Sequence, residues 1–244
     1  MARTSLRFIA CAIVLLAFSS AYGQTITWKG YQWNVTNGGM AGVAPGDPAN
    51  VQIDANGYLH LGIIHRTKGW TASELFTANN LGFGVYQWVV EGDVYNMDKS
   101  TVLGLFTYGP ANGIGVDGED EIDIEFSKWD NTCGICNADF TVYPSTGNRK
   151  SGGAPSWEDD FHVSGGNLTT ARMEWSSDRI KFTIMKGVQP IGTAANILKT
   201  LLYSSNTTNI PQDALPVGIN LWCFQTPPAR NQSVVIRDFQ FSPQ

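Results

Sequence analysis

Short segments in which apolar and polar residues alternate make up most of the chain, and residues typical of turns separate them. Alternation with a period of two predicts half-buried β-strands, because successive side chains of a strand point to opposite faces. The clearest hairpin joins segments 51–54 and 58–64 through Asn56-Gly57, a pair that favours a tight turn. The other predicted strands are 84–94, 101–108, 121–125, 140–143, 170–175, 180–184, 217–224 and 234–241.

Helical patterns are almost missing from the sequence. One short window, residues 193–202, favours a helix. Many strands at short spacing, joined by turns rich in glycine and asparagine, are typical of an all-β sandwich or jelly roll. The glycine- and proline-rich segment 37–48 predicts a surface loop, and no linker divides the chain. The pattern therefore predicts one all-β domain.

The first residues form a segment of a different kind. Arg3 and Arg7 precede a short apolar run, and Gly23 ends a cleavage-like Ala-Tyr-Gly sequence. These are the parts of a secretory signal peptide, and the apolar run is too short to span a bilayer. We expect a signal peptide at 1–23, a single domain at 24–244 and a secreted protein, extracellular or periplasmic. A retained anchor is the alternative.

Composition narrows the range of partners. The net charge is −5, and loss of two arginines with the signal peptide makes it more negative. An acidic chain without a cluster of lysines or arginines argues against nucleic acid and against anionic membranes. Only 15% of residues are charged whereas tryptophan occurs eight times, a balance that favours neutral ligands with flat apolar faces, such as sugars. We expect the protein to be a monomer.

Three cysteines follow the signal peptide: Cys133, Cys136 and Cys223. An odd number in an exported protein leaves at least one thiol unpaired or paired elsewhere. We expect a structural disulfide between two of the three, and the first two could close a tight loop. The sequence does not decide which two pair. Zinc would need more ligands nearby than these residues and three histidines in the whole chain provide.

The most informative strand is acidic. Glu121, Asp123 and Glu125 alternate with Ile122 and Ile124, so the three carboxyl groups share one face and the isoleucines the other. Ionised carboxylates at this spacing repel one another, so some of them should hold their protons unusually tightly. Carboxyl groups with divergent proton affinities are what acid/base hydrolysis of a glycosidic bond requires. The alternative is a solvated outer face of an ordinary antiparallel strand.

The spacing of the two glutamates is compatible with hydrolysis that retains the anomeric configuration. On a flat strand the Cα atoms of Glu121 and Glu125 lie about 13 Å apart. Retaining glycosidases hold their carboxyl groups about 5–5.5 Å apart, and inverting ones about 6.5–9.5 Å. Side chains that lean inward, or a curved sheet, can recover the difference, so the spacing permits retention without proving it. Asp123 between them can share a proton with one neighbour.

The hexapeptide Glu121–Phe126 resembles the signature of glycoside hydrolase family 16. Its uninterrupted form resembles the lichenase and xyloglucan-transglycosylase branches of that family. Other segments resemble bacterial lichenases in the same order along the chain, over about residues 70–240. These segments are Ser73-Glu74, 81–86, 106–108, Phe161-His162, Glu174-Trp175 and 220–222.

The resemblance implies a concanavalin A-like β-jelly roll with a concave cleft. It implies Glu121 as nucleophile, Glu125 as general acid/base and Asp123 as the assisting carboxylate. The residues that match positions lining the family's cleft are Glu74, Tyr143, Asn220 and Trp222. The activity implied is a retaining endo-β-glucanase acting on β-1,3-1,4-glucan or a related β-glucan. A transglycosylase on a β-glucan or xyloglucan and a non-catalytic carbohydrate-binding module are the alternatives.

The chain departs from the lichenase pattern at several positions. Phe76 stands where lichenases have an arginine that contacts sugar, and Asp139 and Thr141 stand where they have glutamine and asparagine. The insert 133–136 has no lichenase counterpart. These departures leave the identity of the glucan open.

The resemblance also implies a structural calcium ion in some family members. Gly57, through its carbonyl, and Asp238 match the positions that hold it, and oxygen ligands of that kind suit Ca²⁺. The alternative for Asp238 is an ordinary surface carboxylate. The chemistry itself requires no cofactor.

The tryptophans divide into buried and surface candidates. Trp175 alternates with polar neighbours on a strand and is expected in the core. Trp222, at a strand end, fits either the core or a platform for a sugar ring. The tryptophans expected in or beside loops are Trp33, Trp70, Trp129 and Trp157.

Overall fold

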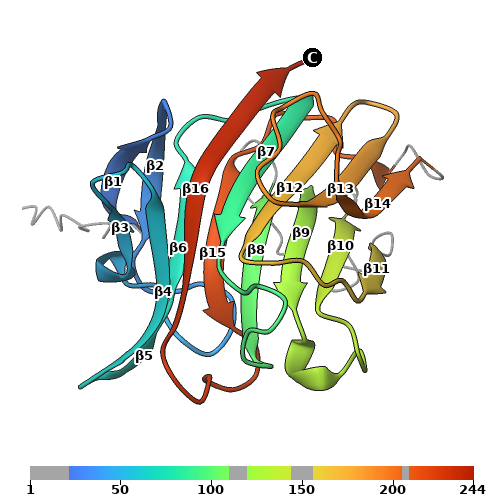
Figure 1. The fold of residues 1–244 in the computed structure, drawn as a ribbon. Coiled ribbons are helices and arrows are strands. Elements are labelled where there is room, and N and C mark those ends of the chain that lie inside the picture. Colours follow the sequence, from blue (N-terminus) through green and yellow to red (C-terminus); the bar gives the residue numbers. More distant parts are fainter. Residues whose placement is uncertain (1–21, 110–119, 144–155, 205–208) are drawn as a thin grey trace, which may run out of the picture.

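The computed structural model describes residues 22–109, 120–143, 156–204 and 209–244, which form two stacked antiparallel β-sheets (Figure 1). Most of the predicted signal peptide lies outside the described residues. The all-β sandwich predicted from the sequence is confirmed. No helix in the described part of the chain has the length and apolar content needed to cross a bilayer.

One sheet, here called the front sheet, has eight strands in a non-sequential order. In that order they are β1 (Tyr22–Trp28), β2 (Tyr31–Thr36), β6 (Ser73–Thr77), β15 (Val217–Cys223), β8 (Thr101–Thr107), β9 (Glu121–Ser127), β10 (Ala138–Tyr143) and β11 (Trp157–Phe161). The acidic strand β9 therefore lies between β8 and β10, where both of its edges are paired.

The other sheet, the back sheet, covers one face of the front sheet. Its order is β14 (Ile197–Tyr203), β13 (Ile180–Lys186), β12 (Leu168–Trp175), β7 (Gly84–Glu91), β16 (Gln232–Pro243), β4 (Leu59–Arg66) and β3 (Val51–Ile53), and β5 (Gly69–Thr71) pairs with β4. Two short 3₁₀ turns, η1 (Pro48–Asn50) and η2 (Trp129–Asn131), complete the regular structure of the described residues.

The core fills the space between the sheets. On β9, Ile122, Ile124 and Phe126 are fully buried there, so the alternation in the sequence sends the carboxyl groups to the opposite face. Phe140 of the front sheet stacks on Phe182 of the back sheet, with ring centroids 4.6 Å apart. Burial of each large apolar side chain contributes about 1.5–3 kcal/mol, and this layer fixes which face of β9 is turned outward.

One predicted element is wrong. The window 193–202 is not helical, because Ile197–Tyr203 form β14, with Leu201 opposite Phe182 of β13. Without β14, one edge of β13 would have unpaired backbone groups, and pairing satisfies them. That gain outweighs the weak helical preference of a short window.

Two further details differ from expectation. Trp33, expected in or beside a loop, lies on β2, is fully buried and donates its indole N–H to the Trp28 carbonyl oxygen at 3.1 Å. The strand expected at 84–94 ends at Glu91, before Gly92 adopts φ +142°. Trp175, expected in the core, is 1% exposed, which confirms that prediction.

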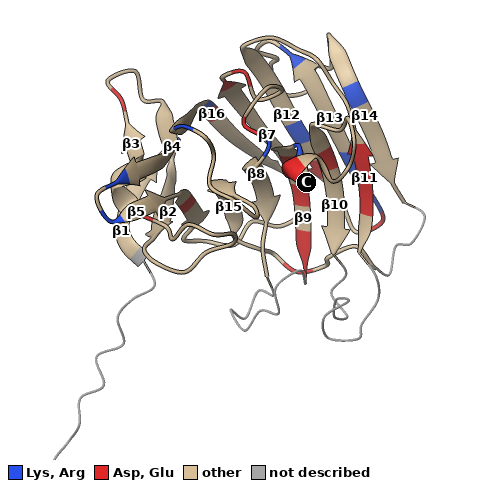
Figure 2. Cartoon of the chain, turned by 90° about the horizontal axis from the view of Figure 1, so that it is seen from below, with Lys and Arg blue, Asp and Glu red and all other residues tan. Residues whose placement is uncertain are grey.

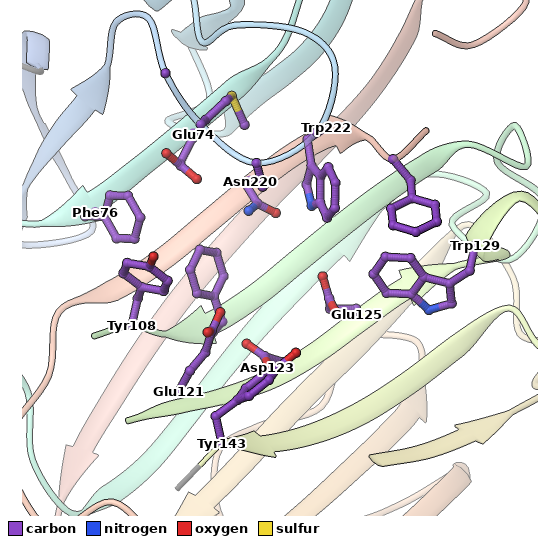
Figure 3. A pocket seen from close by; sticks show the side chains of 16 residues that line it. Glu74, Phe76, Tyr108, Glu121, Asp123, Glu125, Trp129, Tyr143, Asn220 and Trp222 are labelled. Atoms are coloured by element: carbon purple, nitrogen blue, oxygen red, sulfur yellow. The ribbon is translucent and has the colours of Figure 1, made fainter. Parts of the chain in front are cut away.

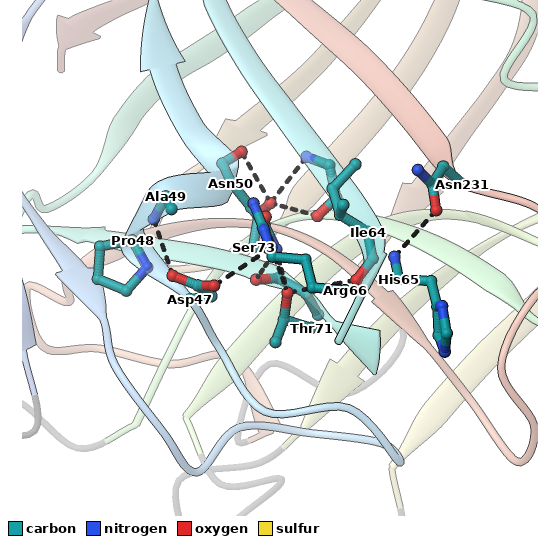
Figure 4. Close-up of polar contacts among 12 residues, drawn as sticks. Asp47, Pro48, Ala49, Asn50, Ile64, His65, Arg66, Thr71, Ser73 and Asn231 are labelled. Atoms are coloured by element: carbon teal, nitrogen blue, oxygen red, sulfur yellow. Dashed lines mark hydrogen bonds and ion pairs between the residues drawn. The ribbon is translucent and has the colours of Figure 1, made fainter. Parts of the chain in front are cut away.

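A buried polar cluster joins the two sheets at one end (Figure 4). The Ser73 hydroxyl on β6 lies 2.7 Å from the Gly62 carbonyl oxygen on β4 and accepts the Gly62 N–H at 2.8 Å. Nearby, the Asn50 amide donates to the Thr71 hydroxyl and to the Ala72 carbonyl oxygen. These bonds anchor the segment that we call the 37–50 loop, part of which lines the cleft described below.

We expect Ser73→Ala to lower the free energy of unfolding by about 1–3 kcal/mol, because the Gly62 backbone groups would lose a buried partner. Ser233 is the matched control, since it lies opposite Gly62 on β16 but is exposed. Ser233→Ala should change stability by no more than about 0.5 kcal/mol. Urea denaturation of both variants measures the difference, and equal effects would contradict the assigned role.

Candidate active site

A cleft of about 710 Å³ lies on the outer face of the front sheet. Strands β6, β8, β9, β10 and β15 supply its floor, and the 37–50 loop and η2 supply parts of its wall. The lining residues are Gly39, Met40, Ala41, Gly42, Glu74, Phe76, Phe106, Tyr108, Glu121, Asp123, Glu125, Trp129, Tyr143, Asn220, Trp222 and Phe224.

The three acidic residues of β9 lie side by side along the cleft floor (Figure 3). Asp123, in the middle, is 4% exposed and is hydrogen-bonded to Glu121. Across the sheet, Glu121 is opposite Tyr143, and Glu125 is opposite Asp139 on the same neighbouring strand. The expected grouping of the carboxyl groups on one face is confirmed.

Burial controls the proton affinity of these groups. It raises the pKa of Asp123 well above its usual value, and the charges of Glu121 and Glu125 raise it further. Burial also raises the pKa of Glu125 well above the ordinary value, with added repulsion from Asp139 and Glu121. Both carboxyl groups therefore hold a proton at pH values where an exposed carboxyl would be ionised.

No cation on a neighbouring strand relieves this repulsion. Within the eight described strands of the front sheet there is no lysine, arginine or histidine. The lysines and arginines of the described strands lie on the back sheet, whereas β9 and β11 of the front sheet carry acidic residues along their length (Figure 2). The charged side chains on the described strands of the cleft floor are therefore all acidic.

Glu74 and Asn220 form a second polar group on the floor. Glu74 is 8% exposed and accepts a hydrogen bond from the Thr36 hydroxyl at 2.9 Å, and burial raises the pKa of its carboxyl. Asn220 lies opposite Glu74 and accepts the Gly104 N–H at 3.0 Å. A Cβ on Gly104 would lie 2.5 Å from the same amide oxygen, so a larger residue here would displace the Asn220 side chain.

Aromatic side chains form two groups beside the row of carboxyl groups (Figure 3). Beyond Glu125, Trp222, Trp129 and Phe224 pack edge to face, with centroids 5.1–6.2 Å apart. A second group, the rings of Phe76 on β6, Phe106 on β8 and Tyr108 just after β8, has centroids 5.6–6.1 Å apart, and Phe106 is directly opposite Asp123. Each group offers apolar ring surface to a ligand in the cleft.

Trp222 is held by the 37–50 loop. The Val43 N–H donates to the Cys223 carbonyl oxygen, and Gly42, at φ +80°, has its Cα against the Trp222 ring. A Cβ on Gly42 would lie 2.5 Å from that ring. Trp222 is 9% exposed and belongs both to the core and to the cleft lining, so the two alternatives for it are not exclusive.

The residues predicted from the sequence come together. The residues predicted to be catalytic or to bind substrate all line the cleft: Glu121, Asp123, Glu125, Glu74, Tyr143, Asn220 and Trp222. The sequence did not single out Phe106 and Tyr108 as site residues. Their signal was present, because they alternate on the strand before the acidic one and Phe106 is directly opposite Asp123.

The expected calcium ligands have other partners. The Gly57 carbonyl oxygen accepts the Trp28 indole N–H at 2.9 Å. The Asp238 carboxylate is paired with the Lys29 ammonium group at 3.3 Å and accepts a hydrogen bond from Gln240 at 2.7 Å. An ammonium group beside the only carboxylate expected there does not fit a Ca²⁺ site, because it already balances the negative charge.

Cys133 and Cys136 form a disulfide after η2, and Cys223 is a buried free thiol. The structure thus answers which two cysteines pair. Together with Asp160 they are, among the described residues, the only three histidine, cysteine, aspartate or glutamate side chains whose donor atoms all lie within 4.8 Å of one another. Their sulfur atoms are bonded to each other, so they do not offer thiolates to a metal.

Stability should fall between pH 5 and pH 8. Asp123, Glu125 and Asp139 have raised pKa values when folded, to about 8 for Asp139, so the folded chain keeps protons that the unfolded chain loses above about pH 4. Urea denaturation should therefore give a larger free energy of unfolding at pH 5 than at pH 8. Asp139→Asn should reduce this difference, and replacement of the exposed Asp213 by asparagine should not.

Comparison of the whole chain with known proteins supports the fold. The sequence matches no protein-family model and no curated protein. Among solved structures, it superposes on a Bacillus licheniformis β-glucanase with a TM-score of 0.62 and 18% identity, over 87% of this chain and 92% of that one.

Two further structures are similar. A glycoside hydrolase family 16 endo-glucanase from Bacteroides ovatus, in complex with G4G3G-2F-DNP, has a TM-score of 0.64 and 13% identity, over 86% of this chain and 94% of that one. The laminarinase catalytic domain from Thermotoga maritima has a TM-score of 0.62 and 14% identity, over 87% and 91%. At these identities the likeness establishes the fold, a jelly roll of the kind found in family 16 glucanases.

Proposed function

We propose that the protein is a secreted, retaining endo-β-glucanase that cleaves β-1,3-1,4-glucan or a related neutral β-glucan. The observation that carries the proposal is the row of three carboxyl groups on the floor of a cleft that two groups of aromatic rings also line. The three similar structures named above, two glucanases and a laminarinase, support the substrate class.

The proton affinities support distinct roles for the two glutamates. Glu125 has a pKa well above the ordinary value, so at neutral pH it holds the proton that a general acid must deliver to the leaving oxygen. Glu121 would attack the anomeric carbon as a carboxylate. Asp123, buried and protonated, is hydrogen-bonded to Glu121 and would donate its proton in that bond, which favours the ionised form of Glu121.

The reaction then takes two steps. Glu121 forms a bond to the anomeric carbon while the bond to the leaving oxygen breaks, and that oxygen takes the proton of Glu125. Glu125, now a carboxylate, removes a proton from water, and the resulting hydroxide releases the sugar from Glu121. Two displacements at one carbon restore its original configuration.

The cleft suits a neutral polymer. It crosses strands β6, β15, β8, β9 and β10, so a chain can lie along it with sugar faces on the two aromatic groups. Phe76, at the position where the lichenase pattern has an arginine, adds a ring to one of these groups. Trp222 lines the cleft, and its buried indole N–H has no partner among the described residues.

We expect reducing sugar to be released from barley β-glucan or lichenan in a panel that also contains laminarin and xyloglucan. Glu121→Gln and Glu125→Gln should each lower kcat by about 10²-fold or more, because each removes a group that acts in the transition state. Glu174→Gln, on the back sheet, should leave kcat unchanged. Binding of every polymer without release would indicate a carbohydrate-binding module, and products longer than the substrate would indicate a transglycosylase.

The configuration of the first product tests the mechanism separately. Proton NMR of the reaction in its first minutes should show the β-anomer at the new reducing end, followed by slow mutarotation to the α/β mixture. Initial formation of the α-anomer would overturn the nucleophilic role of Glu121 while leaving hydrolysis intact.

A further inference from the structure

Asp139 has no part in the reaction above, yet it lies directly opposite Glu125 on the neighbouring strand β10. It is 1% exposed and does not line the cleft. A carboxyl group so deeply buried beside a second carboxyl group is costly unless its environment compensates for it. The surroundings of Asp139 supply that compensation.

Two donors are aimed at Asp139. The Trp129 indole N–H donates to its Oδ1 at 2.9 Å, and the Thr141 hydroxyl donates to its Oδ2 at 3.2 Å. Both bonds favour the ionised form of the carboxyl group, and both lower its pKa against the effect of burial. No hydrogen bond of this kind stabilises the ionised form of Glu125 among the described residues.

Asp139 and Glu125 must therefore lose their protons in a fixed order. When one proton has left, the remaining charge is favoured on Asp139, where two donors meet it, and the proton stays on Glu125. The charge on Asp139 then opposes ionisation of Glu125 across the strand pair.

We propose that Asp139 is a positioning residue that keeps the proton on Glu125 and so extends the acid form of Glu125 to higher pH. This inference rests on the proposed hydrolytic function only for its kinetic consequence. The order in which the two carboxyl groups lose their protons is a property of the protein itself.

The other groups around Glu125 do not replace this effect. On its own strand, Asp123 and Glu121 are acidic, and across the sheet Glu158 and Asp160 on β11 face the row that contains Asp139. On the β8 side the residue opposite Glu125 is Gly104, which carries no charge. On β15 and η2 the neighbours lining the cleft are Asn220, Trp222 and Trp129. The nearest of these carboxyl groups on another strand, by register, is Asp139.

The pH dependence of kcat/KM on the panel substrate that is cleaved tests the kinetic consequence. Asp139→Asn should shift the alkaline limb of this pH profile to lower pH by about one unit or more, because removal of a nearby like charge lowers the pKa of Glu125. The acidic limb, which depends on Glu121, should move less. Asp160→Asn is the matched control, since it removes a carboxylate of the same row one strand further away. It should shift the alkaline limb by less than about 0.3 unit.

Carbon-13 NMR of labelled glutamate and aspartate carboxyl groups tests the inference without turnover. In the wild-type protein Asp139 should titrate at a lower pH than Glu125, and in Asp139→Asn the Glu125 midpoint should fall. The wild-type order alone keeps the test valid if the variant does not fold. Reversed order, an unchanged Glu125 midpoint, or an equal shift in Asp160→Asn would overturn the inference.

The two proposals fail in different ways. If no polymer is cleaved but Glu125 titrates after Asp139 and its midpoint falls in Asp139→Asn, the proposed function is wrong and the inference holds. If a polymer is cleaved and Asp139→Asn lowers kcat equally at every pH without moving either limb, Asp139 has only a structural role.

Discussion

Repulsion between buried carboxyl groups is the constraint on which the functional face of this protein depends. Asp123, Glu125 and Asp139 lie on adjacent strands of a sheet whose described strands contain no cation. Such an arrangement is unfavourable by itself. It persists because the opposite face of β9 is locked into an apolar core, so the strand cannot turn its acids toward bulk water without exposing Ile122 and Ile124.

The register of the front-sheet strands determines which groups lie on either side of Glu125. One row across the front sheet contains Glu74, Asn220, Gly104, Glu125 and Asp139, each opposite the next. A glycine between two polar side chains lets Asn220 lie across it, and the partners on either side of Glu125 are therefore unequal. One side has no side chain, and the other has a hydrogen-bonded carboxyl group. The difference in proton affinity along β9 follows from position in the sheet more than from residue type.

Much of the fold and the acidic row could be predicted, because both depend on alternation within single strands. Alternation of this sort predicted the strands before and after the acidic one, and with them the sandwich itself. The features that the sequence did not predict depend on contacts between strands. β14 is an edge strand formed by pairing with β13, and the role of Phe106 beside Asp123 follows from a register that no single strand encodes. The Trp129–Asp139 bond joins a turn to a strand and has no sequence pattern of its own.

Under the proposed function, the absence of cations from the described front-sheet strands would also favour neutral polysaccharides over charged ones. Uronate or sulfate groups on a polymer would bring negative charge next to the Glu121 carboxylate, in a cleft that offers no lysine or arginine on its strands. Polyanions would have to enter with their counterions, at an energetic cost that neutral polymers avoid. In a mixture of cell-wall polymers, the charge of the cleft would thus also select which polymers reach Glu121 and Glu125.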